Sequence, residues 1–436
     1  MPRSESPTRR RRRATAAGTL AVAAALTVTA ACGPSDSTGG DGATTITFWS
    51  PSLWVNDEAE MVALVDEFNA SQDEVFVEYT VLQWADGRDK IKQAVAAGTG
   101  PDVFFINAGL DSALAEGGRL LPVEQLGIPD EELAAFTPLV EANVYEGELL
   151  AVPLYFETMM LLYRPDILAE YGFDAPPATW EQLRETAATI TEESGGEVLG
   201  YQLKGMDDHL NAINLTWQMF FQQAGGQLVT DGRSSQHSPE GIEALEYLRE
   251  FYESGTSRIG VSAQQGFASG DVAMYSFIPK TADDAVQAGL EFGEGWSVAP
   301  NPAGPDNGAA WTTGHSLAAN ADTEHAEAAG EFIRFMTSPE TSVRYMEFNQ
   351  LPPYDLDALP AEQAALIRDA EAADPIWALV REQLARDTAD QLDDYRHGDA
   401  ARWPTQSRNI VAALTGDVSI EEALRTIDAD IDAAAG

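Results

Sequence analysis

The residues best suited to bind a ligand are aromatic rings that accompany carboxylate and amide groups. Glu157 directly follows an apolar run, where a carboxylate is costly to bury without a polar partner. Most tryptophans belong to cores and many strand-end glutamates are solvated, so neither type is decisive alone. As a set, the rings predict a surface on which a flat apolar face can stack. They occupy expected loop or strand-end positions and are Trp54, Trp84, Tyr155, Trp217, Tyr275, Trp311 and Trp403.

This combination suits a carbohydrate. Pyranose rings present apolar C–H faces that pack on indole, while their hydroxyls need hydrogen-bond donors and acceptors. Polar side chains expected beside the rings would supply those partners. They are Ser52, Asn107, Asp111, Glu157, Asn211 and Asn214.

Residue types typical of catalysis or metal binding are sparse. The five histidines, at 209, 237, 315, 325 and 397, show no ligand-type spacing, and Cys32 is the sole cysteine. We find no P-loop, no Gly-x-Gly-x-x-Gly opening a helix and no Gly-x-Ser-x-Gly elbow. We therefore predict a protein without catalytic residues, metal or cofactor. The 69 carboxylates after the leader keep a glycosidase-like pair open as an alternative.

The N-terminus has the order of a secretory signal. Arg9 to Arg13 form a basic block, an Ala-rich apolar segment runs to Ala31, and Cys32 follows. Cys32 after Thr29-Ala30-Ala31 resembles the lipobox of bacterial lipoproteins, which predicts a signal peptide over 1–31 and lipidation at Cys32. Residues 32–43 are rich in Gly and Ser and predict a flexible tether. Plain cleavage with an incidental Cys32, and twin-arginine export, stay open.

The charge excludes one class of partner. The formal net charge is −44, and residues 1–31 carry six Arg and one Glu, so the remainder carries −49. A body this acidic does not hold nucleic acid by neutralising phosphates. The apolar fraction is that of a globular protein, so the charge indicates solubility and self-repulsion rather than disorder.

Strand and helix patterns alternate in the first part of the chain. Strands are expected at 44–49, 75–82 and 102–106, with helices after the first strand and at 89–97. This order predicts a parallel sheet with right-handed crossovers. Such sheets bind ligands beyond the carboxyl ends of their strands, here 50–54 and 107–111.

A second α/β unit follows residue 150. Residues 150–166 contain two apolar runs around Glu157 and Thr158. Capping boxes open helices at Thr179 and Ser419, and Trp180 is interpreted as a packing residue. The other expected strands are 198–203, VAMYSF, 296–300 and 315–320, and the expected helices are 211–223, 238–253 and one containing Ala329, Phe332, Ile333 and Met336.

Six motifs, in this order, resemble one family. The chain is similar to the extracellular solute-binding lipoproteins of ABC importers, in the class that carries maltose, other oligosaccharides and glycerol phosphates. The similarity runs from Thr44 to about Ala434. The motifs are ITFW, KIKQAVAAGTGPDV from Lys90, AVPLYFETMMLLYRPDILAEYGFDAPPATWEQL from Ala151, FASGDVAM from Phe267, AAGEFIRFMTSPE from Ala328 and GDVSIEEAL from Gly416.

The resemblance implies a periplasmic-binding-protein-like fold of two discontinuous α/β lobes that close about a hinge. Lobe 1 would be 44–153 with 302–352, and lobe 2 would be 154–301 with 353–436. In the maltose-binding branch, Glu157 matches a sugar-binding glutamate and Trp403 a stacking tryptophan. The chain departs at Asn214, where that branch has a stacking tyrosine, and at Asn107, where an adjacent site has tryptophan.

The resemblance also implies a function. We expect a monomer, lipid-anchored on the extracytoplasmic face of the cell membrane, that captures a sugar and delivers it to an ABC permease. A binding protein for a glycerol phosphodiester or a polyamine is an alternative, as is a secreted glycoside hydrolase or a surface scaffold. An anionic ligand should need Arg or Lys in the mouth, and the expected mouth loops contain neither.

Overall fold

The computed structural model describes residues 42–52, 55–107, 112–136, 138–205, 212–347, 350–386 and 399–435. The predicted signal peptide, Cys32 and the tether up to residue 41 lie outside these ranges. Within them, no helix combines the length and apolar character needed to cross a bilayer.

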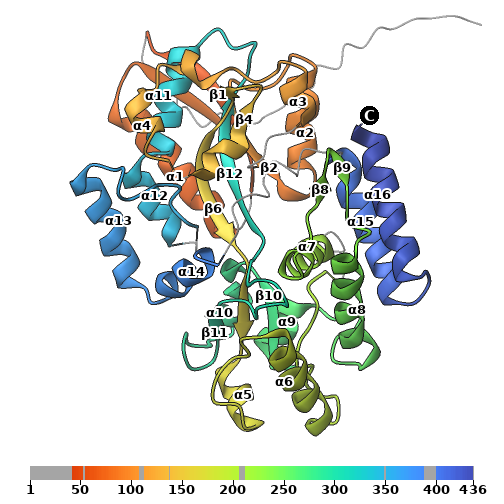
Figure 1. Ribbon diagram of the computed structural model, residues 1–436. Helices are drawn as coiled ribbons and strands as arrows, with labels where there is room; N and C mark the ends of the chain where they lie inside the picture. The colour runs from red at the N-terminus through yellow and green to blue at the C-terminus, as the bar shows by residue number, and fades with distance from the viewer. Residues whose placement is uncertain are drawn as a thin grey trace, which may run out of the picture. The chain divides into compact units, whose positions relative to one another are not determined.

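The first sheet has five strands and a mixed topology. The predicted parallel part is confirmed: β1 pairs in parallel with β2 on one side and β3 on the other. β12 then pairs antiparallel with both β3 and β6, and β6 and β12 run side by side in Figure 1. The strand order is β2 (Val75–Gln83), β1 (Thr44–Ser52), β3 (Val103–Asn107), β12 (Thr312–Ala319), β6 (Val152–Thr158).

Alternation along the strands buries both faces of this sheet. In β3, Phe105 belongs to one hydrophobic cluster, while Phe104 and Ile106 belong to another. This two-residue period is what a strand covered on both faces requires. The surrounding helices are α1 (Val55–Ser71), α2 (Trp84–Ala96), α3 (Ser112–Glu116), α4 (Asp130–Leu133), α11 (Ala326–Met336) and α12 (Pro339–Met346), with a hairpin of β4 (Val144–Tyr145) and β5 (Glu148–Leu149).

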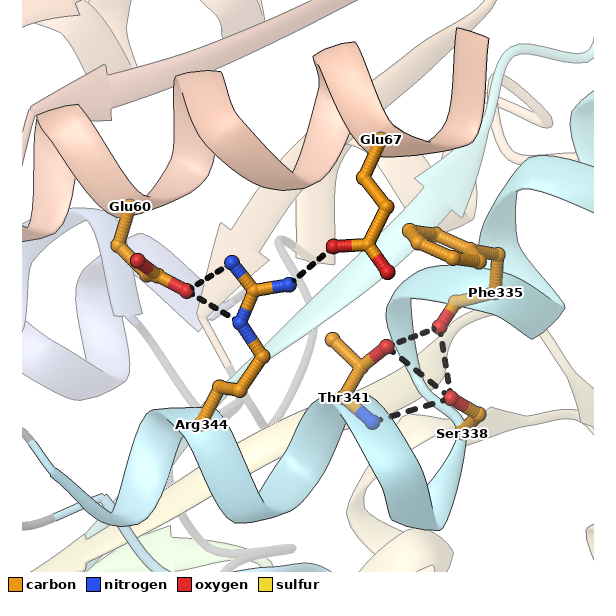
Figure 2. Close-up of polar contacts among 6 residues, drawn as sticks. All are labelled: Glu60, Glu67, Phe335, Ser338, Thr341 and Arg344. Carbon is orange, nitrogen blue, oxygen red and sulfur yellow. Dashed lines mark hydrogen bonds and ion pairs between the residues drawn. The ribbon is translucent and has the colours of Figure 1, made fainter. Parts of the chain in front are cut away.

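Arg344 joins α12 to α1. Its guanidinium donates to the carboxylates of Glu60 and Glu67, which lie two turns apart on α1 (Figure 2). α12 begins at a Ser338 cap, whose hydroxyl accepts from the Thr341 backbone N–H. The cap fixes where α12 starts, and the ion pairs fix where it lies on α1.

The second sheet is smaller, and it contributes to two cores: Leu162 belongs to the cluster that includes the first sheet, whereas Leu161 belongs to a second core. β7 (Met160–Tyr163) is flanked on both sides by antiparallel partners, β10 (Met274–Phe277) and β11 (Ser297–Ala299). A hairpin of β8 (Val229–Thr230) and β9 (Arg233–Ser234) follows α7. The associated helices are α5 (Pro165–Glu170), α6 (Trp180–Glu193), α7 (Ile213–Gln223), α8 (Pro239–Glu253), α9 (Ala263–Ser269), α10 (Asp283–Gln287), α15 (Asp399–Leu414) and α16 (Ile420–Ala435).

Capping residues predicted from the sequence mark the starts of α6 and α16. Thr179 caps α6 by accepting from the Gln182 N–H, and Ser419 caps α16 by accepting from the Glu422 N–H. Trp180 is buried and stacks on Tyr247 at 4.2 Å between ring centroids, which confirms its packing role. The strand predicted at 198–203 is wrong in extent, because only an isolated bridge between Leu199 and Val272 forms.

The chain passes between the two sheets at three places, and hydrogen bonds tie these crossings together. Met159, between β6 and β7, donates its N–H to the Trp311 carbonyl at 3.0 Å and accepts from Asn301 Nδ2 at 2.7 Å. The Asn301 N–H in turn donates to Gln383 Oε1. Phe156 and Leu351 exchange backbone hydrogen bonds at the third crossing. It leads to α13 (Ala361–Ala373) and α14 (Ile376–Leu384), which carries Gln383.

Candidate functional site

The site begins where the strands of the first sheet end. β6 is antiparallel to β12, as β3 is, so the carboxyl ends of β1, β3 and β6 share an edge with the amino end of β12. Asn107, His315 and Tyr155 form one row across the sheet, and Thr313 pairs with Glu157 two residues nearer the edge. The sheet therefore brings Asn107 and Glu157 to the same edge from opposite sides of β12.

His315 lies at the centre of this row. Its ring stacks on Phe105 with centroids 4.4 Å apart and meets Tyr155 edge-on at 5.2 Å. Burial, followed by the positive charge of Arg88, lowers the pKa of His315 to about 3. The imidazole is thus neutral at physiological pH.

Glu157 approaches this neutral imidazole. The distance from His315 Nε2 to Glu157 Oε2 is 3.9 Å, which would count as an ion pair only with a protonated ring. The buried, stacked environment of His315 disfavours the charged form of its ring, so this contact is not an ion pair. Glu157 itself is only 6% exposed. Gly314 permits the close approach of β12 and β6, since a Cβ there would lie 2.3 Å from the Phe156 ring.

Arg88 is a site residue that the loops did not reveal. It lies in the first half of α2, and its charge acts on His315. Burial lowers the pKa of Arg88 itself, opposed by neighbouring Asp89. The positive charge that acts on His315 therefore comes from a helix, whereas the expected mouth loops contain neither Arg nor Lys.

Two buried polar atoms near this edge have no partner among the described residues. They are Asn107 Oδ1, an acceptor at the end of β3, and Trp311 Nε1, a donor directly before β12. Buried polar atoms are normally hydrogen-bonded, so each marks a position where a ligand or water would supply the missing partner. One needs a donor and the other an acceptor, and a hydroxyl can serve as either.

Three rings predicted to contact a ligand lie inside the cores instead. Trp217 and Tyr275 are 0% exposed and Tyr155 is 1% exposed. Trp217 donates its indole N–H to Gln236, and the Tyr275 hydroxyl lies 3.0 Å from the Thr281 hydroxyl. The prediction for these rings is wrong in this structure, because no ring face is open to stacking.

Trp311 and Trp403 keep partly exposed side chains at the margin of the second core. Asn214 is fully buried, and its amide contacts α15 rather than open space. The structure therefore does not support the predicted contact between the Asn214 side chain and a ligand. Ser52 ends β1 and Trp84 begins α2, but their side chains are not among those described. Trp54, Asp111 and Asn211 lie outside the described residues.

Comparison with known proteins identifies the family. The model of the family described as bacterial extracellular solute-binding protein matches residues 54–342 of the 436. The chain belongs to this family. The family-level resemblance expected from the sequence is thereby confirmed, and membership implies an extracytoplasmic location.

Relatives of this solute-binding protein carry names of binding proteins. It is 27% identical over 58% of its length to a probable ABC transporter-binding protein of Deinococcus radiodurans, and 26% identical over 69% to a maltotriose-binding protein of Pyrococcus abyssi. These matches span 62% and 64% of the relatives' own lengths. The GacH receptor of Streptomyces glaucescens, solved unliganded and with acarbose, aligns with a TM-score of 0.76 at 22% identity, covering 90% of this chain and 98% of that one.

The structural match confirms the two-lobed α/β fold of this solute-binding protein. Among the residues described, no three or more His, Cys, Asp or Glu side chains are grouped to hold a metal ion. His315 was the site residue most hidden in the sequence. Glu157 lies 158 positions earlier, and only the insertion of β12 beside β6 brings the two together.

Proposed function

We propose that this protein is the substrate-binding component of an ABC importer, and that it captures a sugar, preferably an oligosaccharide, by closing two lobes over it. Lobe 1 would be residues 44–153 with 302–352, and lobe 2 residues 154–301 with 353–436. The closed form must bind the sugar better than the open form, or occupancy would not be communicated. The sugar would be released intact to the permease, without catalysis.

One observation carries the proposal for a hydroxyl-rich ligand. Asn107 Oδ1 and Trp311 Nε1 are buried and unpartnered among the described residues, and Glu157 lies at the same sheet edge. Each gains a hydrogen bond from a hydroxyl, and removing a partner from a buried polar atom costs about 1–3 kcal/mol. The partly exposed rings of Trp311 and Trp403 add stacking surface for sugar C–H faces. The maltotriose-binding relative supports the same ligand class.

We further propose that the mature chain begins at a lipidated Cys32 and functions as a monomer. The order of basic block, apolar segment and cysteine supports the lipidated N-terminus. Mass spectrometry of the membrane-bound protein tests it, because lipidation adds a diacylglyceryl mass to Cys32. A Cys32→Ser variant should be released from the membrane. Retention of that variant on the membrane would contradict the anchor.

A thermal-shift screen tests the ligand class. Maltotriose, disaccharides and monosaccharides are compared with glycerol phosphates and polyamines. Binding to the native state alone stabilises it by about 2.7 kcal/mol at a hundredfold excess over Kd, so a true ligand raises Tm measurably. We expect the shift from a neutral oligosaccharide. A shift from only the phosphates or only the polyamines would replace the sugar with that class, and cleavage of the oligosaccharide would indicate a hydrolase.

A further inference from the structure

A row of buried amide side chains joins α7 to α15, which carries Trp403. Asn214 and Gln218, one turn apart on α7, face α15, and α7 and α15 pack directly against each other (Figure 1). Gln218 Nε2 donates to Gln406 Oε1 at 3.1 Å, and Gln406 Nε2 donates to Gln236 Oε1 at 2.7 Å. All four amide residues are 0% exposed. We call this row the amide seam.

Asn214 uses the seam to hold the backbone of Trp403. Its Nδ2 donates to the Trp403 carbonyl at 2.9 Å. The Ser407 hydroxyl lies 3.1 Å from Asn214 Oδ1 and 2.8 Å from the same Trp403 carbonyl. Because Ser407 has a single hydroxyl proton, it donates either to Asn214 Oδ1 or to the Trp403 carbonyl at any moment, and the Asn214 amide is the other side-chain donor to that carbonyl.

Pro404 makes the hydrogen bond from Asn214 to the Trp403 carbonyl more important for the position of that residue. Proline inside a helix has no N–H to donate and its ring opposes the carbonyl four residues earlier, so the helix bends there. The turn that carries Trp403 precedes Pro404 and is less firmly held by the helix's own hydrogen bonds. The hydrogen bonds of the seam are directional, whereas apolar contacts tolerate sliding and rotation, and Gln218 Oε1 is a buried seam acceptor with no partner among the described residues. The seam thus selects one rotation of α15 on α7.

We propose that Asn214 is a positioning residue: through the Trp403 carbonyl it fixes the direction of the Trp403 indole and so contributes to sugar affinity without touching the sugar. This rests on the proposed function, in which the Trp403 ring stacks on the ligand. It also accounts for the chain's departure from a stacking aromatic at residue 214.

The test combines a ligand-free and a ligand-dependent measurement on the mature soluble chain. The tryptophans are labelled with 5-fluorotryptophan, and the ¹⁹F resonance of Trp403 is assigned by its loss in Trp403→Phe. Asn214→Leu should shift or broaden this resonance, and Ser407→Ala should do so more weakly. Ser407→Ala also keeps the test decisive if Asn214→Leu does not fold, because Ala is a good helix former.

Thr405→Val is the matched control. The Thr405 hydroxyl donates to Asp430 of α16 at 2.7 Å. Thr405→Val therefore removes a partly buried side-chain hydrogen bond of α15, but not one to the Trp403 carbonyl. It should leave the Trp403 resonance in place. An unmoved resonance in both seam variants, or an equal shift in the control, overturns the positioning role.

Affinity for maltotriose, measured by calorimetry, completes the test. We expect Asn214→Leu to weaken binding by about tenfold and Thr405→Val by less than about twofold. In a Trp403→Ala background, Asn214→Leu should cause no further loss, since the ring it positions is absent. A further loss there would indicate direct contact and overturn the proposal. Failure of the wild-type protein to bind any sugar would count against the proposed function, whereas the resonance decides the positioning role separately.

Discussion

The imidazole of His315 is held neutral between aromatic rings beside the only carboxylate that β6 contributes to the sheet edge. A neutral imidazole can donate or accept one hydrogen bond without adding charge to the site. Such a group suits a site that orients hydroxyls. It also makes the folded state sensitive to acid, because the ring gains a proton readily only after unfolding.

His315→Gln should reduce this acid sensitivity. The pKa is about 3 in the folded protein and 6.5 ordinarily, so between these values the unfolded chain binds a proton that the native state does not. Stability is full above pH 6.5 and is lost as pH falls toward 3, by up to about 1.4 kcal/mol per pH unit. In urea unfolding measured from pH 7 to 4, the unfolding free energy should fall less steeply with decreasing pH for His315→Gln than for the unsubstituted protein. His237→Gln, at an exposed histidine, is the control; equal slopes in all three proteins would contradict the prediction.

Trp403→Ala should weaken sugar binding by about 1–3 kcal/mol, the scale of losing an aromatic stacking contact in a desolvated site. Trp180→Phe is the contrasting variant, because that ring is buried in the second core, stacks on Tyr247 and has no hydrogen bond to the amide seam among the described residues. It should lower the midpoint of urea unfolding and leave affinity nearly unchanged. Calorimetry with maltotriose measures the first effect. Unchanged affinity in Trp403→Ala would remove that indole from the site.

At the scale of elements, the attachment of α12 to α1 depends on Arg344. The hydrogen bonds to Glu67 and the nearby charge of Glu60 outweigh burial and raise the pKa of Arg344. Arg344→Met should cost about 1 kcal/mol in unfolding free energy, because these groups are only partly buried. The loss should shrink in 1 M NaCl, where surface ion pairs are screened.

Arg368→Met is the matched control for this pair. Arg368 has 51% of its side chain exposed and bridges to the highly exposed Asp357. Its loss should change the unfolding free energy by less than about 0.5 kcal/mol. Equal effects of the two substitutions would mean that Arg344 does not organise the α1–α12 contact.

The elements themselves could be predicted where the signal is local. The strand at 75–82, the Thr179 cap and the helix after Pro239 depend on residues close in sequence, and the structure confirms them. The segment at 198–203 carries the same β-type residues and lies beside β10, with backbone hydrogen bonds from Leu199 and Gln202, but the pairing amounts to a single bridge rather than a strand. Strand propensity does not specify a partner.

The site could be predicted only in part for the same reason. Glu157 and Asn107 stand out as polar residues after apolar runs, and both lie at the sheet edge. Trp217 could not be recognised as core, because its burial depends on residues outside α7 such as Gln236, and not only on Phe221 one turn along the same helix. Arg88 was missed because α2 begins earlier than the pattern indicated, at Trp84.

At the scale of the whole molecule, sugar binding should make the protein more compact. In the proposed closure, the two sheets would move as units about the hydrogen-bonded crossings at residues 158–160, 300–312 and 351. Small-angle X-ray scattering should show a smaller radius of gyration with saturating maltotriose. A sugar that gives no thermal shift is the control. An unchanged radius with bound sugar would contradict hinge closure.

The position of β12 has a consequence for how the chain leaves the cell. β12 separates β3 from β6, yet it is made of residues 312–319, long after both. Until those residues emerge from the ribosome, the first sheet lacks the strand that joins β3 to β6, and the facing edges of those two strands stay unpaired. Such a nascent chain cannot complete its fold prematurely, which keeps it threadable through a translocation pore and dependent on holding chaperones until synthesis is nearly complete.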